Sequence, residues 1–226
     1  MISLRKREVA KRVFAYEFNN STHKIRESND DRAPIYVLTP TGARCNRVFV
    51  VGVLLEREET RPDSDFWRIR ISDPTGVFIG FIGKFQPDAL SSILQIEPPE
   101  IVATVGKVRV FEGQNRKIVT IRPESITIVN TATRDYWIYE TALKTIERIK
   151  KMYEKSDEDV KLAWQVYNPD LKEYEKMVKT ALNSIREREV KPLEEKEEIS
   201  EEDFEKFEEE FEIEEEEWDI SDILGS

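Results

Sequence analysis

The strongest constraint on the fold is a pair of alternating runs, residues 66–72 and 77–82, joined by the sequence Asp-Pro-Thr-Gly. In the first run, three apolar residues alternate with Arg68, Arg70 and a serine, which is the period of a β-strand with one buried face and one basic face. Pro74 cannot donate a hydrogen bond to a neighbouring strand, and Asp and Gly favour turns. The stretch therefore predicts a β-hairpin.

A second hairpin is predicted further along the chain, with strands at residues 100–111 and 117–121. Between the hairpins, residues 86–94 are typical of a short helix with proline in its first turn. Residues 47–56 supply a long first strand. Five strands with a helix between the third and fourth follow the order of an OB barrel, a fold whose face and loops bind oligonucleotides and oligosaccharides. We therefore expect a mainly β protein with a five-stranded OB-fold barrel and C-terminal helices.

Three motifs carry a family resemblance: Ile-Ser-Asp-Pro-Thr-Gly at 71–76, Val-Gly-Lys-Val-Arg-Val-Phe at 105–111, and Arg-Glu-Val-Ala-Lys-Arg-Val-Phe-Ala at 7–15. Over roughly residues 5–155 the chain resembles the central OB domain of the middle subunit of replication protein A, and its opening resembles the archaeal members and the proteins associated with them. The resemblance implies a non-catalytic subunit of a heterotrimer that binds and protects single-stranded DNA in replication, repair and recombination. Other OB-fold subunits would then be its partners.

After the barrel, residues 135–154 predict an amphipathic helix of about 20 residues, which is marginal unless its apolar stripe is buried. The resemblance implies that the three subunits form a helix bundle here, with Tyr139, Leu143, Ile146 and Ile149 in the interface. The alternative is that the stripe packs on its own barrel or on the next helix. One further helix is expected with Ser156 as its N-cap and a break at Pro169, and another with Asn168 as its N-cap, running to about Arg188.

The chain thus divides into five expected segments. They are a basic N-terminal arm (1–34), an OB-fold domain (35–131), an oligomerisation helix (132–155), a helical segment (156–189) and a disordered acidic tail (190–226). In the arm, a short helix is expected to lead into an extended segment that contains Phe14 and Phe18, and residues 19–34 are typical of a loop. The arm could contact DNA or a neighbouring subunit, or pack as a strap on the barrel.

Charge is divided unevenly along the chain. Residues 191–226 hold 18 Asp and Glu against 3 Lys, a net charge of −15, whereas residues 1–190 carry a net charge of +4. So dense a charge of one sign favours disorder. Apolar residues in this tail could dock on a partner such as a replicative polymerase or primase: Phe204, Phe207, Phe211, Trp218, Ile220, Ile223 and Leu224. The alternative is a tail that only increases solubility.

Basic and aromatic side chains are expected to converge on one groove of the barrel, where they would bind phosphates and stack on bases. The candidate residues are Arg68, Arg70, Phe78, Phe81, Lys84, Lys107, Arg109, Phe111, Arg116 and Lys117. Phe85 is a further candidate, and Phe78, Phe81 and Phe85 could equally belong to the core. The same physics would serve RNA, so an RNA-binding OB protein stays open, as does an architectural subunit with little direct DNA contact.

The composition gives little support for catalysis. One cysteine (Cys45) and one histidine (His23) do not make a disulfide framework or a Cys/His zinc cluster. The sequence contains no glycine-rich phosphate loop, and a metal nuclease would need the tail carboxylates held by a scaffold. We expect no enzyme activity, no cofactor and no bound metal. Without a signal peptide or a long apolar run, the expected location is the cytoplasm, with no membrane contact.

Overall fold

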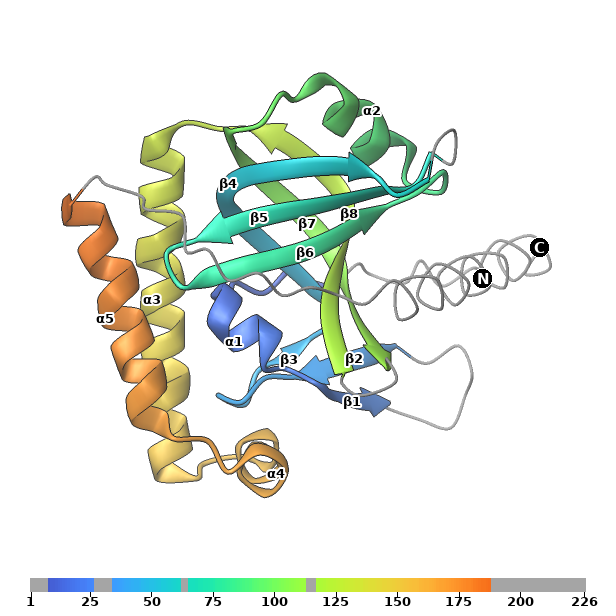
Figure 1. Cartoon of the computed structure of the whole chain (residues 1–226). Helices are drawn as coiled ribbons and strands as arrows, with labels where there is room; N and C mark the ends of the chain where they lie inside the picture. The colour runs from blue at the N-terminus through green and yellow to red at the C-terminus, as the bar shows by residue number, and fades with distance from the viewer. Residues whose placement is uncertain (1–7, 27–33, 62–64, 113–116, 188–226) are drawn as a thin grey trace, which may run out of the picture.

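The computed structural model describes residues 8–26, 34–61, 65–112 and 117–187, and its centre is a closed five-stranded barrel (Figure 1). The barrel strands are β4 (Arg47–Glu59), β5 (Trp67–Asp73), β6 (Gly76–Ile82), β7 (Glu100–Glu112) and β8 (Lys117–Ile128). Their order around the barrel is β4-β5-β6-β8-β7, and the parallel pairing of β6 with β8 closes it together with the antiparallel pairing of β4 with β7. The expected OB-type barrel with C-terminal helices is confirmed.

The first hairpin forms as the alternation predicts, because Ile69 and Ile71 turn into the core and are each 1% exposed. The Asp73 carboxylate fixes the turn by accepting hydrogen bonds from Thr75 N (2.7 Å), Thr75 Oγ1 (2.7 Å) and Gly76 N (3.1 Å). It also accepts from Ala15 N at 2.8 Å. Burial raises the pKa of Asp73 to about 6, even though these hydrogen bonds lower it. One buried carboxylate therefore holds both the hairpin and the N-terminal segment in place.

The second hairpin is longer than the sequence indicates, since β8 runs on to Ile128 instead of ending at residue 121. A β-bulge between Val105 and Gly106 places Gly106 opposite Pro123. A Cβ at Gly106 would lie 2.5 Å from the Arg122 carbonyl oxygen, so only glycine fits this close approach. Proline is tolerated at such an irregular position, and the strand continues past it.

The helix α2 (Pro87–Gln95) connects β6 to β7 and closes one end of the barrel, as expected from the sequence (Figure 1). Ala89 and Ile93 enter the barrel core and are fully buried. Pro87 stands in the first turn of the helix. Backbone N–H groups have no intrahelical acceptor there, so the N–H that proline lacks is not needed. The exposed face carries Leu94 and the acidic Asp88.

The N-terminal segment reverses the expected order of helix and extended chain. Lys11 forms a parallel bridge with Val48 of β4, and the helix α1 (Ala15–Asn19) follows it. Phe14 packs edge-on against Trp137 with ring centroids 5.7 Å apart, and Phe18 packs against Phe78 at 5.3 Å. The prediction that the helix precedes the extended chain was wrong, because packing against the barrel core, and not the local spacing of apolar residues, determines where Phe14 and Phe18 lie. Residues 8–19 are a strap packed on the barrel.

A small antiparallel sheet also departs from the expectation of a loop over residues 19–34. Its strands are β1 (His23–Arg26), β2 (Ile35–Leu38) and β3 (Arg44–Cys45), paired in that order. It lies at the end of the barrel opposite α2 (Figure 1). Leu38 of β2 is fully buried with Met152 and Val160 from the C-terminal helices, so the sheet forms through contacts that are distant in sequence.

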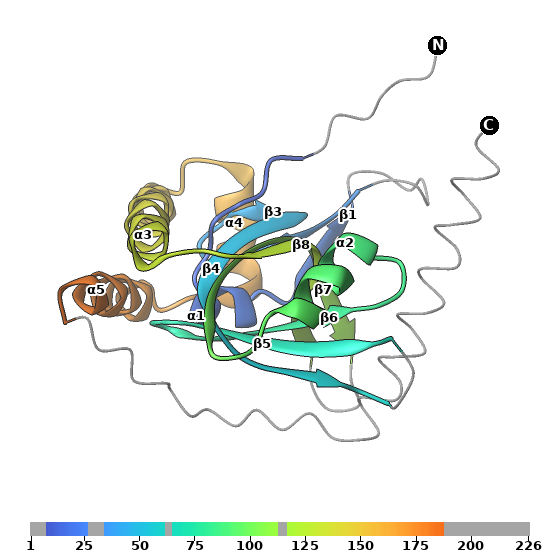
Figure 2. The ribbon, with the colours of Figure 1, turned by 90° about the horizontal axis from the view of Figure 1, so that it is seen from above.

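Three helices follow the barrel: α3 (Thr131–Glu154), α4 (Glu158–Tyr167) and α5 (Leu171–Glu187). The Asp157 side chain caps α4 in place of the expected Ser156, by accepting from Val160 N at 2.9 Å. Asn168, with a left-handed φ of 41°, ends α4 and does not begin the next helix. Helices α3 and α5 run side by side along one flank of the barrel (Figures 1 and 2).

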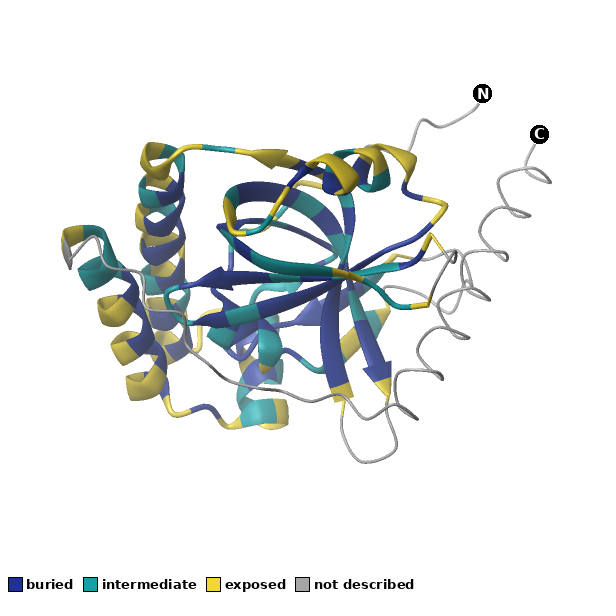
Figure 3. Ribbon diagram, turned by 45° about the horizontal axis from the view of Figure 1, so that its top comes forward, coloured by how far each residue is buried: buried dark blue, intermediate teal, exposed yellow. Residues whose placement is uncertain are grey.

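Two buried contacts fasten α3 to the rest of the molecule. The Trp137 indole N–H donates to the Phe49 carbonyl of β4 at 2.9 Å. Further along, the Arg148 guanidinium binds the fully buried Glu17 carboxylate at 2.7 Å and the Thr41 hydroxyl at 2.8 Å. A buried charge needs such a partner, and this pair connects α1, the β2–β3 loop and α3. The barrel side of α3 is accordingly buried, and the exposed residues of the helix lie on its outward side (Figure 3).

Candidate nucleic-acid interface

The barrel carries its candidate site on the outward side chains of β4 to β8, which we call the outer face. Strand alternation sets this face: in β7, Val108 and Val110 are buried in the core, while Lys107 and Arg109 turn outward and are half-buried. The same alternation turns Arg122 of β8 outward, between the buried Ile121 and Pro123. Strand pairing then decides which outward residues become neighbours.

A row of cations crosses three strands of the outer face. Lys107 of β7 lies opposite Arg47 of β4 on one side and opposite Arg122 of β8 on the other. The pKa of Lys107 is lowered to about 8, mainly by burial and also by the nearby positive charges of Arg122, Arg109 and Arg47. Glu124 opposes this shift and forms an ion pair with Arg47. Three cations thus lie side by side on neighbouring strands, an arrangement that a bound anion would stabilise.

An aromatic and aliphatic cluster lies next to this row, and we call it the outer cluster. Its members are Phe66, Ile79, Phe81, Phe111 and Ile118, and none of them belongs to the main core. Phe111 lies opposite Ile118 in the β7–β8 pair and shares the face of Lys107 and Arg109. The rings of Phe66 and Phe81 are parallel, with centroids 5.6 Å apart. Aromatic and cationic side chains are the residue types that stack on bases and neutralise phosphates, and here both types lie on one face of the barrel.

Phe78, Phe81 and Phe111 occupy different environments, although the sequence suggested one role for all three. Phe78 lies in the main core against Phe18 and is 1% exposed, so it has no ring face to offer a base and is reassigned to the core. Phe81 and Phe111 belong to the outer cluster, where they are 1% and 4% exposed. Stacking on these two rings therefore requires side chains around them to move.

The two arginines of β5 lie on the outer face, and both form ion pairs. Arg70 binds the Glu56 carboxylate of the neighbouring β4 at 3.2 Å, and Arg68 binds Glu58. These carboxylates neutralise part of the positive charge that the sequence suggested for this strand. The outer face of β7 carries Lys107 and Arg109 and, between residues 105 and 111, no acidic residue.

The remaining candidates lie around the rim. Lys84 is exposed beyond the end of β6, with its ammonium 4.9 Å from the ring centroid of Phe85. Lys117 begins β8 and binds the Glu112 carboxylate at 3.2 Å across the mouth of the hairpin. Arg116 and all the docking residues expected in the tail lie outside the described residues.

Sequence reasoning missed Arg47, Arg122 and Phe66. Arg47 opens a strand whose central residues are apolar, and nothing in its own stretch of sequence indicates which residue it faces. Arg122 follows the point at which the sequence suggested that β8 ends. The signal that could have found them is the pairing of strands, because residues opposite Lys107 must share its face.

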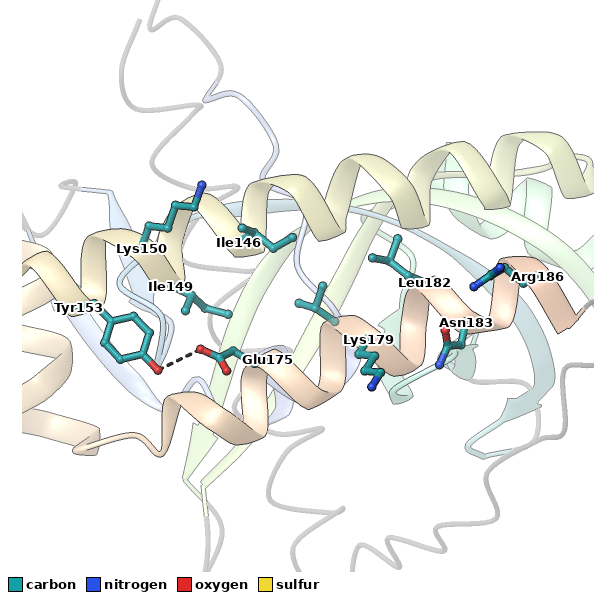
Figure 4. Close-up of a pocket in the computed structure, with 10 residues that line it drawn as sticks. Ile146, Ile149, Lys150, Tyr153, Glu175, Lys179, Leu182, Asn183 and Arg186 are labelled. Atoms are coloured by element: carbon teal, nitrogen blue, oxygen red, sulfur yellow. Dashed lines mark hydrogen bonds between the residues drawn. The ribbon is translucent and has the colours of Figure 1, made fainter.

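A second surface runs along α3 and α5 (Figure 4). The expected interface residues divide here: Tyr139 and Leu143 are 50% and 40% exposed, whereas Ile146 is half-buried and Ile149 is 5% exposed. The last two line a groove of about 550 Å³ with Val178 and Leu182 of α5. Basic side chains, Lys150, Lys179 and Arg186, stand at its rim, and Tyr153 donates to Glu175 at 2.9 Å. Part of the stripe thus packs within the chain, and part stays exposed.

Two further findings concern the described residues alone. No helix among them is long and apolar enough to cross a membrane. Within the same ranges, no three His, Cys, Asp or Glu side chains come close enough together to hold a metal ion.

Comparison with known proteins gives partial structural likeness only. No family model matches the chain, and no curated protein matches it. Among solved structures, a chain of a replication protein A heterotrimer bound to single-stranded DNA gives a TM-score of 0.44 and 15% identity, covering 62% of this chain and 98% of that one. A second single-stranded DNA-binding protein, SSBb from Mycobacterium smegmatis, gives 0.31 and 15%, covering 37% of this chain and 86% of that one. Asparaginyl-tRNA synthetase from Pyrococcus horikoshii gives 0.35 and 10%, covering 64% and 33%.

Proposed function

We propose that this chain is a non-catalytic OB-fold subunit that binds single-stranded DNA. The observation that carries the proposal is the row of Arg47, Lys107 and Arg122 beside the outer cluster, on one face of the barrel. Cations neutralise phosphates without reading sequence, and aromatic rings stack on any base at about 1 to 3 kcal/mol each. A duplex hides its bases, so this combination favours single strands. No cofactor and no metal enter the proposed role.

The proposal includes the assembly that the sequence motifs suggest. The chain would be the middle subunit of an archaeal replication protein A-like heterotrimer, working in the cytoplasm in DNA replication, repair and recombination. The other OB-fold subunits would bind through the exposed residues of α3, Tyr139 and Leu143, continued by the groove at Ile146. Exposed apolar side chains in a row on one helix are the feature that supports a protein interface here.

Binding by the purified full-length chain tests the proposal. We expect weak binding to a single-stranded DNA oligonucleotide, several-fold weaker binding to the matching duplex, and affinity that falls steeply as salt increases because phosphate contacts release counterions. Fluorescence anisotropy at several salt concentrations measures all three. Tighter binding to single-stranded RNA than to DNA would favour an RNA-binding OB protein. No binding to either would favour an architectural subunit, a reading supported by the small exposure of Phe81 and Phe111.

We further propose that residues 191–226 are a partner-docking tail that competes with DNA for the outer face. The tail carries a net charge of −15 and the outer face carries the row of three cations, so the two attract each other at low salt. DNA would release the tail and expose its apolar residues, including Phe204, Phe207 and Phe211, to a replicative polymerase or primase.

Deleting residues 191–226 should tighten DNA binding at low salt, and the gain should vanish at high salt, where the attraction is screened. The deletion should also abolish binding to the polymerase or primase in a pull-down. A chain of the full length whose tail Asp and Glu are changed to Asn and Gln is the control for charge, and it should match the deletion in the DNA assay. If neither binding changes, the tail serves solubility only.

A further inference from the structure

A basic cavity of about 460 Å³ lies outside the candidate interface, between the strap, the β2–β3 loop, α3 and the start of α4. Six cationic and three acidic side chains line it. The cations are Lys11, Arg12, Arg44, Lys144, Arg148 and Lys151, and the acids are Glu147, Asp157 and Asp159. None of these residues belongs to the outer face or to the groove between α3 and α5.

The three carboxylates of the cavity are already engaged. Asp159 binds Arg44 at 2.6 Å, and Glu147 binds Lys144 at 3.1 Å. Asp157 accepts from the backbone N–H of Val160 at 2.9 Å, which caps α4. These contacts leave little acidic charge to meet the remaining cations.

Three of the cations have no carboxylate partner among the described residues. Arg148 is committed to Glu17, but Lys11, Arg12 and Lys151 form no ion pair within those ranges. The Arg12 guanidinium lies over the Phe49 ring at 5.0 Å, and its buried Nε meets no acceptor in the described part of the chain. Lys11 and Lys151 are exposed, so their ammonium groups can reach a ligand in the cavity.

Strand β4 connects the strap beside the cavity to the outer face. Lys11 N donates to the Arg47 carbonyl at 2.8 Å, and Phe49 N donates to the Lys11 carbonyl at 2.9 Å. Arg47 and Phe49 alternate with the fully buried Val48 and Val50, so both project outward from the strand. Cations and one aromatic ring therefore follow one another from Lys107 through Arg47 to Arg12.

We infer that this cavity binds the phosphodiester backbone of a strand that extends beyond the outer face. The choice of DNA as the ligand rests on the proposed function, but the cavity is a different site from the outer face. The outer face binds the first nucleotides, and Lys11, Arg12 and Lys151 bind phosphates further along the same strand. OB folds occupy about 4 to 16 nucleotides each, so an oligonucleotide of about 8 nucleotides fills the outer face alone and one of about 30 reaches both sites.

The test is the full-length variant Lys11→Glu with Lys151→Glu, compared with the parent on both oligonucleotides at about 0.1 M salt. We expect affinity for the longer strand to fall about 30-fold, with a salt slope smaller in magnitude by about 1.4, because two phosphate contacts are lost. Affinity for the shorter strand should change less than twofold. Both side chains are exposed, so the variant should fold as the parent does, with a thermal unfolding midpoint only a few degrees lower at about 0.1 M salt, since Lys151 lies in the last turn of α3. Lys172→Glu with Lys176→Glu, two exposed positions on α5, is the charge-matched control and should leave both affinities unchanged.

The outcomes separate this site from the proposed function. An equal loss of affinity on both strands, or no loss on the longer one, overturns the cavity site and leaves DNA binding at the outer face intact. A parent protein that binds neither strand overturns the proposed function and this inference with it. A length-dependent loss in the variant, absent from the control, supports the cavity site.

Discussion

Replacing Lys107 and Arg109 with glutamate should lower the affinity of the full-length protein for a short single-stranded DNA on the order of 100-fold at about 0.1 M salt. Both side chains project from β7 on the outer face, and their neighbours Val108 and Val110 hold the core. The substitutions therefore remove two phosphate contacts and add two repulsive charges without opening a cavity. Anisotropy titrations measure the loss, and Lys172→Glu with Lys176→Glu is the control of equal charge change.

The pH dependence of the affinity for single-stranded DNA tests whether charged Lys107 contributes to binding. Its folded-state pKa of about 8 lies below the ordinary value of 10.5, so the side chain loses its charge as the pH rises through 8. Affinity of the parent should therefore fall about fivefold between about pH 7 and pH 9, the size of one phosphate contact. Lys107→Arg should flatten this profile because arginine stays charged.

The stability of the fold should respond to Lys107 in the opposite direction. A lysine pKa that is lower in the folded state than in the unfolded state means that charged Lys107 destabilises the fold at neutral pH. The fold therefore becomes more stable as the pH rises from about 8 to 10.5, which chemical denaturation at several pH values measures.

Two results in the binding assays would mean that the outer face is misassigned. One is a double glutamate variant at Lys107 and Arg109 that binds DNA as tightly as the parent, and the other is a pH profile of affinity that Lys107→Arg leaves unchanged.

The barrel could be predicted from the sequence because each hairpin strand has one inward and one outward side. That alternation is visible in residues 66–72 and 105–111 without any knowledge of their partners. It fails where long-range packing replaces it. Pro123 interrupts the pattern of β8, yet the strand continues because the bulge at Gly106 accommodates the proline. The sheet of β1, β2 and β3 likewise forms through contacts with α3 and α4 that no local signal encodes.

The candidate site was predictable in part for the same reason. Lys107, Arg109 and Phe111 could be placed on one face because they alternate within a single strand. Arg47 and Arg122 join them only through the register of three strands. Phe78 and Phe81 are three positions apart, an odd offset, so they lie on opposite faces of β6, one in the core and the other in the outer cluster. Composition could not distinguish them.

The other large effect is expected in assembly. Tyr139→Glu with Leu143→Glu should abolish coelution with the coexpressed OB-fold partner subunits, since an unpaired charge buried in a helix interface costs several kcal/mol. These two positions are preferable to Ile146 and Ile149, which pack towards α5 and would weaken the chain's own fold if charged. Size-exclusion chromatography with light scattering measures the composition of the complex.

A matched control comes from exposed apolar residues elsewhere. Leu94→Glu on α2 and Val166→Glu on α4 change side chains of similar exposure, 46% and 39%, and should leave the complex intact. Circular dichroism should show the same secondary structure for the variants at all four positions as for the parent. Coelution that survives Tyr139→Glu with Leu143→Glu would mean that partners do not bind this stripe. Because α5 already covers the Ile149 side of α3, the packing within the chain would then be the whole role of the helix pair.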